Sequence, residues 1–429
     1  MSSSNYILND IKHLTEKIGV RITGTKQERK AADYLKSRFL EYVPKCEIEE
    51  FPVMVRDVSD EKLEVNLNGE WKSFDVKLFN MSPTTDGETV EAEIVFFDGH
   101  TDYQREDISF INGKAVIHFG FIPSEDAFRR LVSAKPAFIM SVDTRYTSEL
   151  PIANSYLPAY VAKYGAIPTV DLPFYSAWEI LDKGAKCARL TVVGTSTEGK
   201  SQNVIAELPG TDNNPFCIYI GGHMDSVAGS PGADDNAVGC AIAVELARIL
   251  SKKKHRHTIK FIAFGAEEQL SVGCAEYVKK HRDEIEKSGI FMCNFDSCSS
   301  TIGWNRFIIN ANEKIKDQMR KTYNGNDVYY VEVTQPDPCN DMFPFTVCGV
   351  PGVTLMRNNC EIGKFYHHRP DNNISNISTD VAAILASASA KLIEEIANSD
   401  DFKDNFTVDI SCSDNVMDLW KENYGGWDK

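Results

Sequence analysis

Acidic side chains and a histidine gather in the stretch 221–239, which reads GGHMDSVAGSPGADDNAVG. It contains His223, Asp225, Asp234 and Asp235, and it lies between an apolar run and a helix-like run. Carboxylate and imidazole groups are ligands that divalent cations accept in open catalytic sites. A solvated loop that ends in a helix cap is the simpler interpretation, because Asp is common in both. The rest of the sequence has to decide between these two interpretations.

Three later apolar runs, IKFIAF, IFMCNF and VPGVTLM, also precede residues that could bind a metal or transfer a proton. The residues that follow these runs are Glu267, Glu268, Asp296, His367, His368 and Asp371. Each of these features is weak by itself, because a charged pair at the end of a strand is usually solvated. Their repetition after successive runs is much harder to explain by chance.

The elements expected from residue 202 onward explain why these side chains should meet. Strand-like runs alternate with helix-like segments at 235–251 and 271–287, and another helix-like segment follows at 377–396. This alternation predicts an α/β fold with a mixed, mostly parallel central sheet flanked by helices. Sites in open α/β sheets form beyond the carboxyl ends of the strands, so we expect the acids and histidines at one edge.

The types of ligand also indicate which chemistry this edge supports. Several acids and two histidines would repel one another strongly there, and two divalent cations would remove that repulsion. Carboxylate and imidazole without thiolate favour zinc, manganese or cobalt in an open site rather than a structural zinc. Two metal ions that share a carboxylate, about 3.5–4 Å apart, form a hydrolytic centre.

Five segments, HMDS, PGADDNAVG, GAEEQLSVG, NFDS and YHHRPD, occur in this order along the chain. Together they resemble the co-catalytic di-zinc aminopeptidases of metallopeptidase family 28, over roughly 1–60 and 198–397. The N-terminal RITGTKQERKAADYL resembles the family's opening helix. The resemblance implies the fold of the zinc-dependent exopeptidases, a peptide substrate and two divalent ions, with zinc expected and manganese or cobalt as alternatives.

The resemblance also implies a role for each matching residue. Asp234, rather than Asp235, would bridge both metal ions. The four remaining ligands would be His223 and Asp296 on one ion, and Glu268 and His367 on the other. His367 is preferred over His368 because the family's last histidine lies four residues before an aspartate, here Asp371.

Two further residues complete the implied catalytic group. Glu267 would be the general base that takes a proton from the bridging water, and its carboxylate must then stay free of metal. Asp225 would orient His223 through the other ring nitrogen. Adjacent side chains at a strand end point in different directions, so Glu267 and Glu268 can perform different tasks.

One segment departs from the family's pattern, which often reads Ser-Asp-His-x-x-Phe. The corresponding residues here run from Asn340 to Phe345 and keep Asp341 and Phe345, but Met342 replaces the histidine. Asp341 and Phe345 are candidate substrate contacts, as are Tyr366 and Arg369. The replacement therefore bears on substrate specificity or on activity at this position.

The segment 63–195 has a less regular pattern than the part of the chain from residue 202 onward. It contains short strand-like runs at 114–119, 136–142 and 167–173 and short helix-like stretches near 125–134 and 174–184. It resembles a protease-associated (PA) domain, a kind of insertion that covers the cleft and shapes substrate access in related enzymes. We therefore expect a catalytic domain formed by 1–62 and 196–429, interrupted by this insertion. The tail 399–429 stays unassigned.

Composition narrows the class of partner and the compartment. A formal net charge of −16 argues against nucleic acid or an anionic membrane as the main partner, since both need a basic surface. No apolar run is long enough to cross a bilayer, and no signal-peptide pattern is visible. Eleven scattered cysteines indicate reduced thiols. We expect a cytoplasmic protein, and the sequence does not indicate its oligomeric state.

Three other functions compete with the aminopeptidase. A carboxypeptidase of the same clan would need basic residues for the substrate's C-terminal carboxylate, and Arg357 and Arg369 are candidates. A glutaminyl-cyclase-like acyltransferase would share the fold but hold a single zinc ion, and the complete ligand set and the large insertion argue against it. A receptor-like, non-enzymatic relative would have lost its metal ligands, whereas all five ligands and the base are present here.

Overall fold

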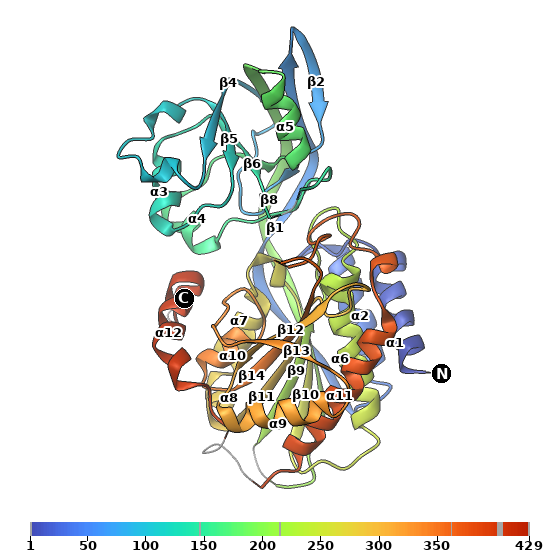
Figure 1. Cartoon of the computed structure of the whole chain (residues 1–429). Coiled ribbons are helices and arrows are strands. Elements are labelled where there is room, and N and C mark those ends of the chain that lie inside the picture. Colours follow the sequence, from blue (N-terminus) through green and yellow to red (C-terminus); the bar gives the residue numbers. More distant parts are fainter. Residues whose placement is uncertain (1, 146, 214–215, 362, 401–405, 428–429) are drawn as a thin grey trace. The chain divides into compact units, whose positions relative to one another are not determined.

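The computed structural model describes residues 2–145, 147–213, 216–361, 363–400 and 406–427. The contacts divide the chain into two compact units (Figure 1). Unit 1 comprises 1–54, 198–367 and 371–429, and unit 2 comprises 55–197 with 368–370. The boundaries at 54/55 and 197/198 fall inside two long strands, β1 (Lys45–Leu67) and β8 (Cys187–Leu208), which pair with each other.

Unit 1 is built on a sheet with the strand order β13-β12-β14-β11-β9-β10-β8. The four central strands β14, β11, β9 and β10 run parallel to one another, whereas β12 and β8 flank them antiparallel. The expected mixed, mostly parallel sheet is therefore confirmed. Its strands are β9 (Cys217–His223), β10 (Thr258–Phe264), β11 (Gly289–Phe295), β12 (Trp304–Asn310), β13 (Tyr330–Val333) and β14 (Gly352–Asn358).

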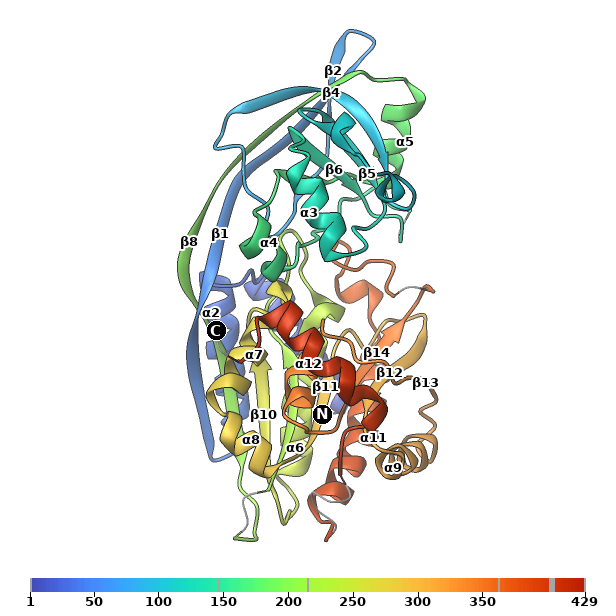
Figure 2. The ribbon, with the colours of Figure 1, turned by 90° about the vertical axis from the view of Figure 1, so that its left-hand side faces the viewer.

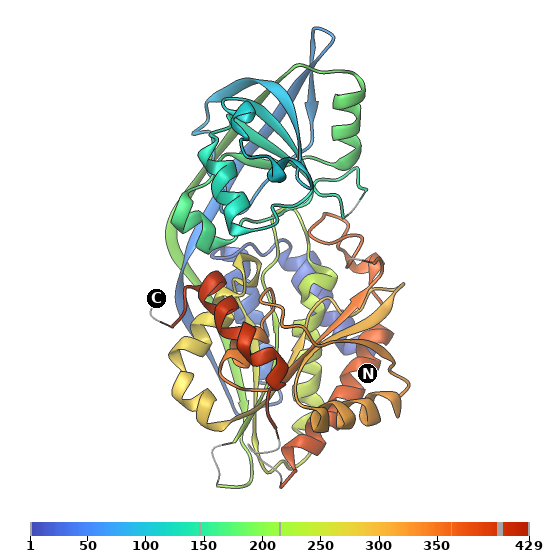
Figure 3. The same ribbon diagram turned by 60° about the vertical axis from the view of Figure 1, so that its left-hand side comes forward.

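Helices cover both faces of this sheet (Figures 1 and 3). The larger layer packs around the central helix α6, and it consists of α1 (Ser3–Lys12), α2 (Lys26–Phe39), α6 (Val238–Leu250), α9 (Glu313–Asn324) and α11 (Thr379–Ala397). The other layer contains α7 (Val272–Lys280), α8 (Arg282–Ser288), α10 (Phe343–Val347) and α12 (Ile410–Tyr424). Each face thereby acquires its own apolar core, as a two-sided α/β sheet requires.

Local sequence explains how two of these elements fit. α2 begins at the Thr25 cap, whose hydroxyl accepts a hydrogen bond from the Glu28 amide at 3.4 Å, as the capping-box spacing predicts. α6 packs closely on β9 because the chain carries glycines on both sides of the contact. A Cβ at Gly222 of β9 would lie only 3.0 Å from the carbonyl carbon of Gly239 on α6, and one at Gly239 would lie 2.2 Å from the Phe295 carbonyl oxygen.

Unit 2 has a smaller sheet with the order β8-β4-β5-β6-β7-β3, in which β4 to β7 are mutually parallel (Figure 2). A two-stranded antiparallel pairing joins β1 to β2 (Glu70–Phe74). The other strands are β3 (Lys77–Leu78), β4 (Thr89–Asp98), β5 (Ala115–Phe119), β6 (Phe138–Val142) and β7 (Thr169–Asp171). The helices are α3 (Glu125–Ser133), α4 (Pro158–Tyr164) and α5 (Phe174–Asp182).

Some elements differ from the sequence-based expectation. The expected helix 271–287 is two helices, α7 and α8, which meet at His281. The unassigned tail contains α12, which packs against α10 through Trp420, a fully buried residue. Among the described residues, no helix is both long and apolar enough to cross a membrane.

Candidate metal centre

The four parallel strands of unit 1 deliver their trailing residues to one edge of the sheet. His223 is the last residue of β9, Asp296 follows β11, and Glu267 and Glu268 form a short 3₁₀ turn beyond β10. The His223 Nε2 atom lies 3.7 Å from Glu267 Oε2 and 4.0 Å from Asp296 Oδ1. The expected convergence is therefore present in the structure, and it arises from the parallel order β14-β11-β9-β10.

Asp235 occupies the centre of this group, between the two histidines. Its Oδ1 atom is 3.2 Å from His223 Nε2, and its Oδ2 atom is 3.2 Å from His367 Nδ1. His223, Asp235 and Asp296 each offer a ligand atom, and these atoms lie within 4.8 Å of one another. The geometry favours Asp235 over Asp234 as a residue that two metal ions could share.

Asp234 has different neighbours, which disagree with the bridging role that we predicted for it. Its Oδ1 atom accepts hydrogen bonds from the Ser299 amide at 2.8 Å and the Ser299 hydroxyl at 3.2 Å. Its Oδ2 atom accepts one from the Tyr366 hydroxyl at 3.0 Å. Consecutive side chains point in different directions, so only one of the adjacent aspartates can face the histidines. The geometry therefore favours Asp235 for the shared position, in place of the Asp234 that we predicted from the sequence.

Asp225 organises the opposite side of the group. Its two carboxylate oxygens accept hydrogen bonds from the amides of Glu267 and Glu268 at 3.1 and 3.2 Å. Its Oδ1 atom also lies 3.4 Å from His223 Nδ1, the nitrogen that faces away from Asp235. A carboxylate in this place is positioned to orient the ring, and its hydrogen bonds hold the turn that carries both glutamates.

The electrostatics of the group suit a cation. Burial alone would lower the pKa of His223, but Glu267, Asp225 and Asp235 raise it well above its usual range. Burial raises the pKa values of Glu267 and Glu268 well above the usual range. So many buried acids around one imidazole create a strongly negative potential that needs protons or metal ions for compensation.

The two adjacent histidines after β14 have different neighbours. His367 approaches Asp235, as described above, whereas the Nδ1 atom of His368 lies 2.9 Å from the Ala153 carbonyl oxygen in unit 2. The preference for His367 that the spacing to Asp371 suggested stays a prediction.

The four candidate substrate contacts differ in their surroundings. Asp341 is 1% exposed, and its pKa is raised well above the usual range by burial and by the nearby Asp296 and Asp225. Phe345 is fully buried, with its ring centroid 4.8 Å from that of Tyr219, so it belongs to the core and cannot contact substrate as we predicted. The Tyr366 hydroxyl donates to Asp234, and Arg369 belongs to unit 2.

Arg21 is a site-supporting residue that sequence reasoning missed. Its guanidinium is fully buried and donates to five backbone carbonyls, including Met224 at 2.7 Å and Pro231 at 2.8 Å. It therefore holds the loop that connects His223 to Asp235. The only signal in the sequence was its place in RITG, directly before a capped helix.

Thr23, from the same segment, reaches the site directly. Its hydroxyl donates to Asp225 Oδ2 at 3.0 Å, so the N-terminal segment contributes to the acid that supports His223. Asp225 thus receives three hydrogen bonds, which provide partners for both oxygens of its buried carboxylate.

The fold and the acid–histidine site together define an α/β protein of the metal-dependent hydrolase class. Comparison with known families is in accord with this class: residues 203–393 match the model of Peptidase family M28. This match covers the part of the chain that contains His223, Asp235, Glu267, Asp296 and His367, and it supports a metal-dependent peptide hydrolase.

Individual proteins are similar over most of the chain. Aminopeptidase YwaD from Bacillus subtilis is 23% identical over 396 residues, which cover 88% of this chain and 81% of YwaD. The solved structure of BSAP, a zinc aminopeptidase from Bacillus subtilis, has a TM-score of 0.77 at 19% identity and covers 94% of this chain and 97% of its own. A Peptidase M28 precursor from Shewanella amazonensis has a TM-score of 0.77 at 21% identity, covering 94% of each chain.

Proposed function

We propose that the chain is a metal-dependent aminopeptidase whose two-metal centre shares Asp235. In this assignment His223 and Asp296 hold one ion, and Glu268 and His367 hold the other. The observation that carries the proposal is the position of Asp235, whose two oxygens each lie 3.2 Å from a different histidine. A single carboxylate that faces two imidazoles in this way suits a pair of ions rather than one.

The residues present fit two divalent cations of the zinc type. All five proposed ligands are carboxylates or imidazoles, and none is a thiolate, which excludes a structural cysteine-rich zinc site for this set. The relatives whose names mention zinc support zinc as the native metal. Bound divalent cations supply Lewis acidity, which polarises a peptide carbonyl and makes water acidic enough to be deprotonated near neutral pH.

Glu267 is the residue we assign to proton transfer. Its Oε1 atom accepts a hydrogen bond from the Ser271 hydroxyl at 3.1 Å, and its Oε2 atom faces His223. The Asp225 carboxylate fixes the backbone amide of Glu267, so the side chain extends from a held position. A glutamate whose pKa is raised by burial can accept a proton from water and return it to the leaving amine.

Aminopeptidase action is favoured over carboxypeptidase action by two observations. YwaD and BSAP are both named aminopeptidases, and both are similar to this chain over most of its length. Arg357, one candidate for a C-terminal carboxylate, already donates to the Ser300 carbonyl at 2.7 Å and to Asn305 Oδ1 at 3.1 Å. We assign the substrate's ammonium group to the buried, acidic surroundings of Asp341.

Two further assignments accompany this function. We propose that unit 2 is a PA-like insertion, supported by its parallel strands and its place between two halves of unit 1 in the sequence. We also propose a reducing, cytoplasmic location, supported by ten described cysteines that are all free thiols.

A substrate panel tests the proposed function. Aminoacyl 4-nitroanilides with free amino groups should be hydrolysed, and the same compounds with acetylated amino groups should not. Treatment with a chelator should abolish hydrolysis, and added zinc, manganese or cobalt should restore it to different extents. Cleavage restricted to N-blocked peptides with free C-termini would replace the aminopeptidase with the carboxypeptidase.

A further inference from the structure

Unit 2 contains a pocket at the carboxyl ends of its parallel strands. Gly120 and Phe121 come directly after β5, and Asp143 comes directly after β6. His118 and Ser141 lie opposite each other in the register of these two strands and line the same pocket. Ligands of open α/β sheets bind outside these strand ends, so the location is the one expected for a site rather than for a packing defect.

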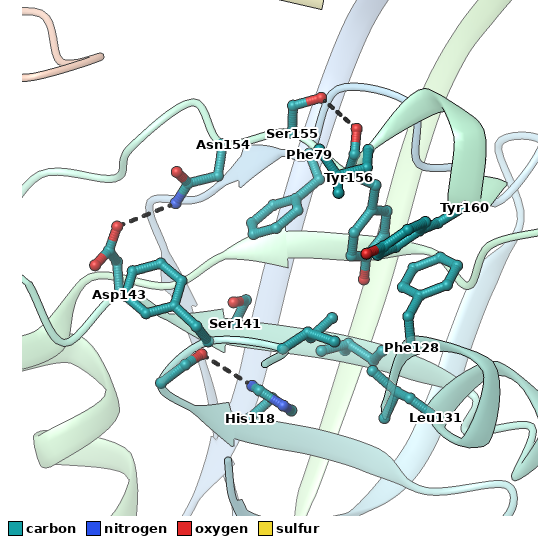
Figure 4. A pocket seen from close by; sticks show the side chains of 15 residues that line it. Phe79, His118, Phe128, Leu131, Ser141, Asp143, Asn154, Ser155, Tyr156 and Tyr160 are labelled. Carbon is teal, nitrogen blue, oxygen red and sulfur yellow. Dashed lines mark hydrogen bonds between the residues drawn. The ribbon is translucent and has the colours of Figure 1, made fainter. Parts of the chain in front are cut away.

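Aromatic rings form one wall of the pocket (Figure 4). Tyr156 lies between Phe79 and Phe128, with ring centroids 5.2 and 5.1 Å apart, and Phe128 lies 5.7 Å from Tyr160. The angles between these rings range from 42° to 70°, which is the tilted or edge-to-face geometry that aromatic groups prefer. An aromatic ring of a ligand could pack against this cluster in the same tilted or edge-to-face geometry.

The volume of the cavity sets the size of the occupant. It measures about 150 Å³. An engineered apolar cavity of about 150 Å³ in another protein binds benzene. A single six-membered ring therefore fits this pocket.

The charged groups at the pocket neutralise one another. Arg145 forms a bidentate pair with Asp143, with Nη2 2.6 Å from Oδ2, and its guanidinium lies 4.5 Å from the Phe121 ring centroid. Burial lowers the pKa of His118 to about 4, so this ring is neutral at pH 7. Its two nitrogens face the Tyr103 hydroxyl at 2.9 Å and the Gly120 carbonyl at 3.1 Å. Because the charged groups that line the pocket are paired and its histidine is neutral, the pocket suits an uncharged ligand.

Ser141 provides the polar contact inside the pocket. Its hydroxyl points toward the cavity in Figure 4. Within the described part of the chain, no protein group forms a hydrogen bond with this hydroxyl. A hydroxyl that is half-buried in such a pocket can recognise one donor or acceptor on a ligand, in exchange for its hydrogen bond to water.

We propose that this pocket binds a single uncharged aromatic ring that carries one hydroxyl group, with that hydroxyl bonded to Ser141. A tyrosine side chain of a peptide and a free phenolic molecule share this chemistry. The proposal concerns binding to unit 2 alone and does not rest on the proposed peptidase function.

Ligand-observed ¹⁹F NMR on the full chain tests the proposal with 4-fluorophenol and fluorobenzene as probes. We expect 4-fluorophenol to bind with a Kd of about 1 mM or tighter. Fluorobenzene, which lacks the hydroxyl, should bind about fivefold more weakly. The absence of binding by 4-fluorophenol at several times this concentration overturns the proposal.

Two variants and a control locate the probe. Ser141→Ala should weaken 4-fluorophenol about fivefold and leave fluorobenzene within about twofold, because only the hydrogen bond is lost. Ser141→Leu should weaken both probes by about tenfold or more, because it fills the cavity. Ser133→Leu places the same side chain on the exposed end of α3 and should change neither. Equal binding to the wild type and Ser141→Leu excludes this pocket as the site.

Competition identifies the source of the ring. N-acetyl-tyrosinamide should displace 4-fluorophenol if peptide side chains are the natural occupants. Displacement by unlabelled phenol without displacement by N-acetyl-tyrosinamide assigns the pocket to free phenolic molecules. Failure of unlabelled phenol to displace the probe contradicts specific binding altogether. None of these measurements requires hydrolysis, so a failed peptidase assay leaves their outcome unaffected.

Discussion

The adjacent aspartates of the ADDN segment should respond very differently to the same substitution. Asp235→Asn keeps the shape of the side chain but removes the charge that faces His223 and His367, each 3.2 Å away. Asp234→Asn removes a charge that faces Ser299 and Tyr366 instead. Because only Asp235 lies between the proposed ligands, we expect metal binding to depend on Asp235 far more than on Asp234.

The loss of metal-binding free energy and of folding stability can be worked out from the number of charged contacts that each variant loses. A contact with a charged group contributes about 1.5–3 kcal/mol, so losing a shared anionic ligand on two ions costs about 3–6 kcal/mol in binding. At about 1.4 kcal/mol per factor of ten, metal affinity should fall about 10²- to 10⁴-fold for Asp235→Asn. Asp234→Asn can keep its Oδ1 contacts with Ser299, so it should cost about 1.5–3 kcal/mol of folding stability and change metal affinity by less than about threefold.

Elemental analysis after dialysis against buffered zinc measures the difference, with thermal unfolding as the stability readout. Tyr366→Phe is the matched control, because it removes the same hydrogen bond from the other side and leaves both aspartates charged. We expect Tyr366→Phe and Asp234→Asn to resemble each other in metal content and in loss of Tm. Full metal content in Asp235→Asn together with depleted metal in Asp234→Asn would refute the assignment.

Three further predictions test other parts of the structure. Glu267→Gln should keep the fold and the metal content but lower kcat by about 10²-fold or more, since only the proton acceptor changes; an unchanged kcat for an aminoacyl nitroanilide would contradict the assignment. Arg21→Met should lower the free energy of unfolding by more than about 3 kcal/mol in denaturant titrations, because it leaves buried carbonyls without donors. Burial raises the pKa of Asp171 to about 8, so the folded chain keeps a proton that the unfolded chain loses near pH 4. Its contribution to stability is present below about pH 4 and is lost as the pH rises through about 8, and Asp171→Asn should therefore lose less Tm than the wild type between pH 5 and 8.5.

The strand ends could be predicted because they follow from two regular patterns. Apolar runs alternate with helix-like segments in the second half of the chain, and that alternation specifies parallel strands whose ends meet. His223, Glu267 and Asp296 each come at or just after such a run, so their convergence needed no knowledge of side-chain orientation. The same reasoning explains why unit 1 was easier to interpret than the short, irregular elements of unit 2.

Features set by side-chain direction or by distant contacts could not be predicted in the same way. Phe345 has the spacing of a substrate contact, but its ring packs against Tyr219 in the core, and only tertiary packing determines that outcome. The helix in the tail acquires its stability from Trp420 and its neighbours on α10. Arg21 resembles any exposed arginine in the sequence until the carbonyls of a loop 203 residues later surround it.

The different surroundings of Asp234 and Asp235 and the position of Tyr366 have one physical explanation. Tyr366 directly precedes His367, and its hydroxyl donates to Asp234. Asp234 therefore ties the loop that carries His367 to the segment that carries Asp235, while Asp235 faces both histidines. A pair of adjacent acids at such a place can divide two tasks, because successive side chains point in different directions. Spacing alone identifies the pair as part of the site, but the partner of each acid decides which one can bind metal and which one holds the ligand loop in place.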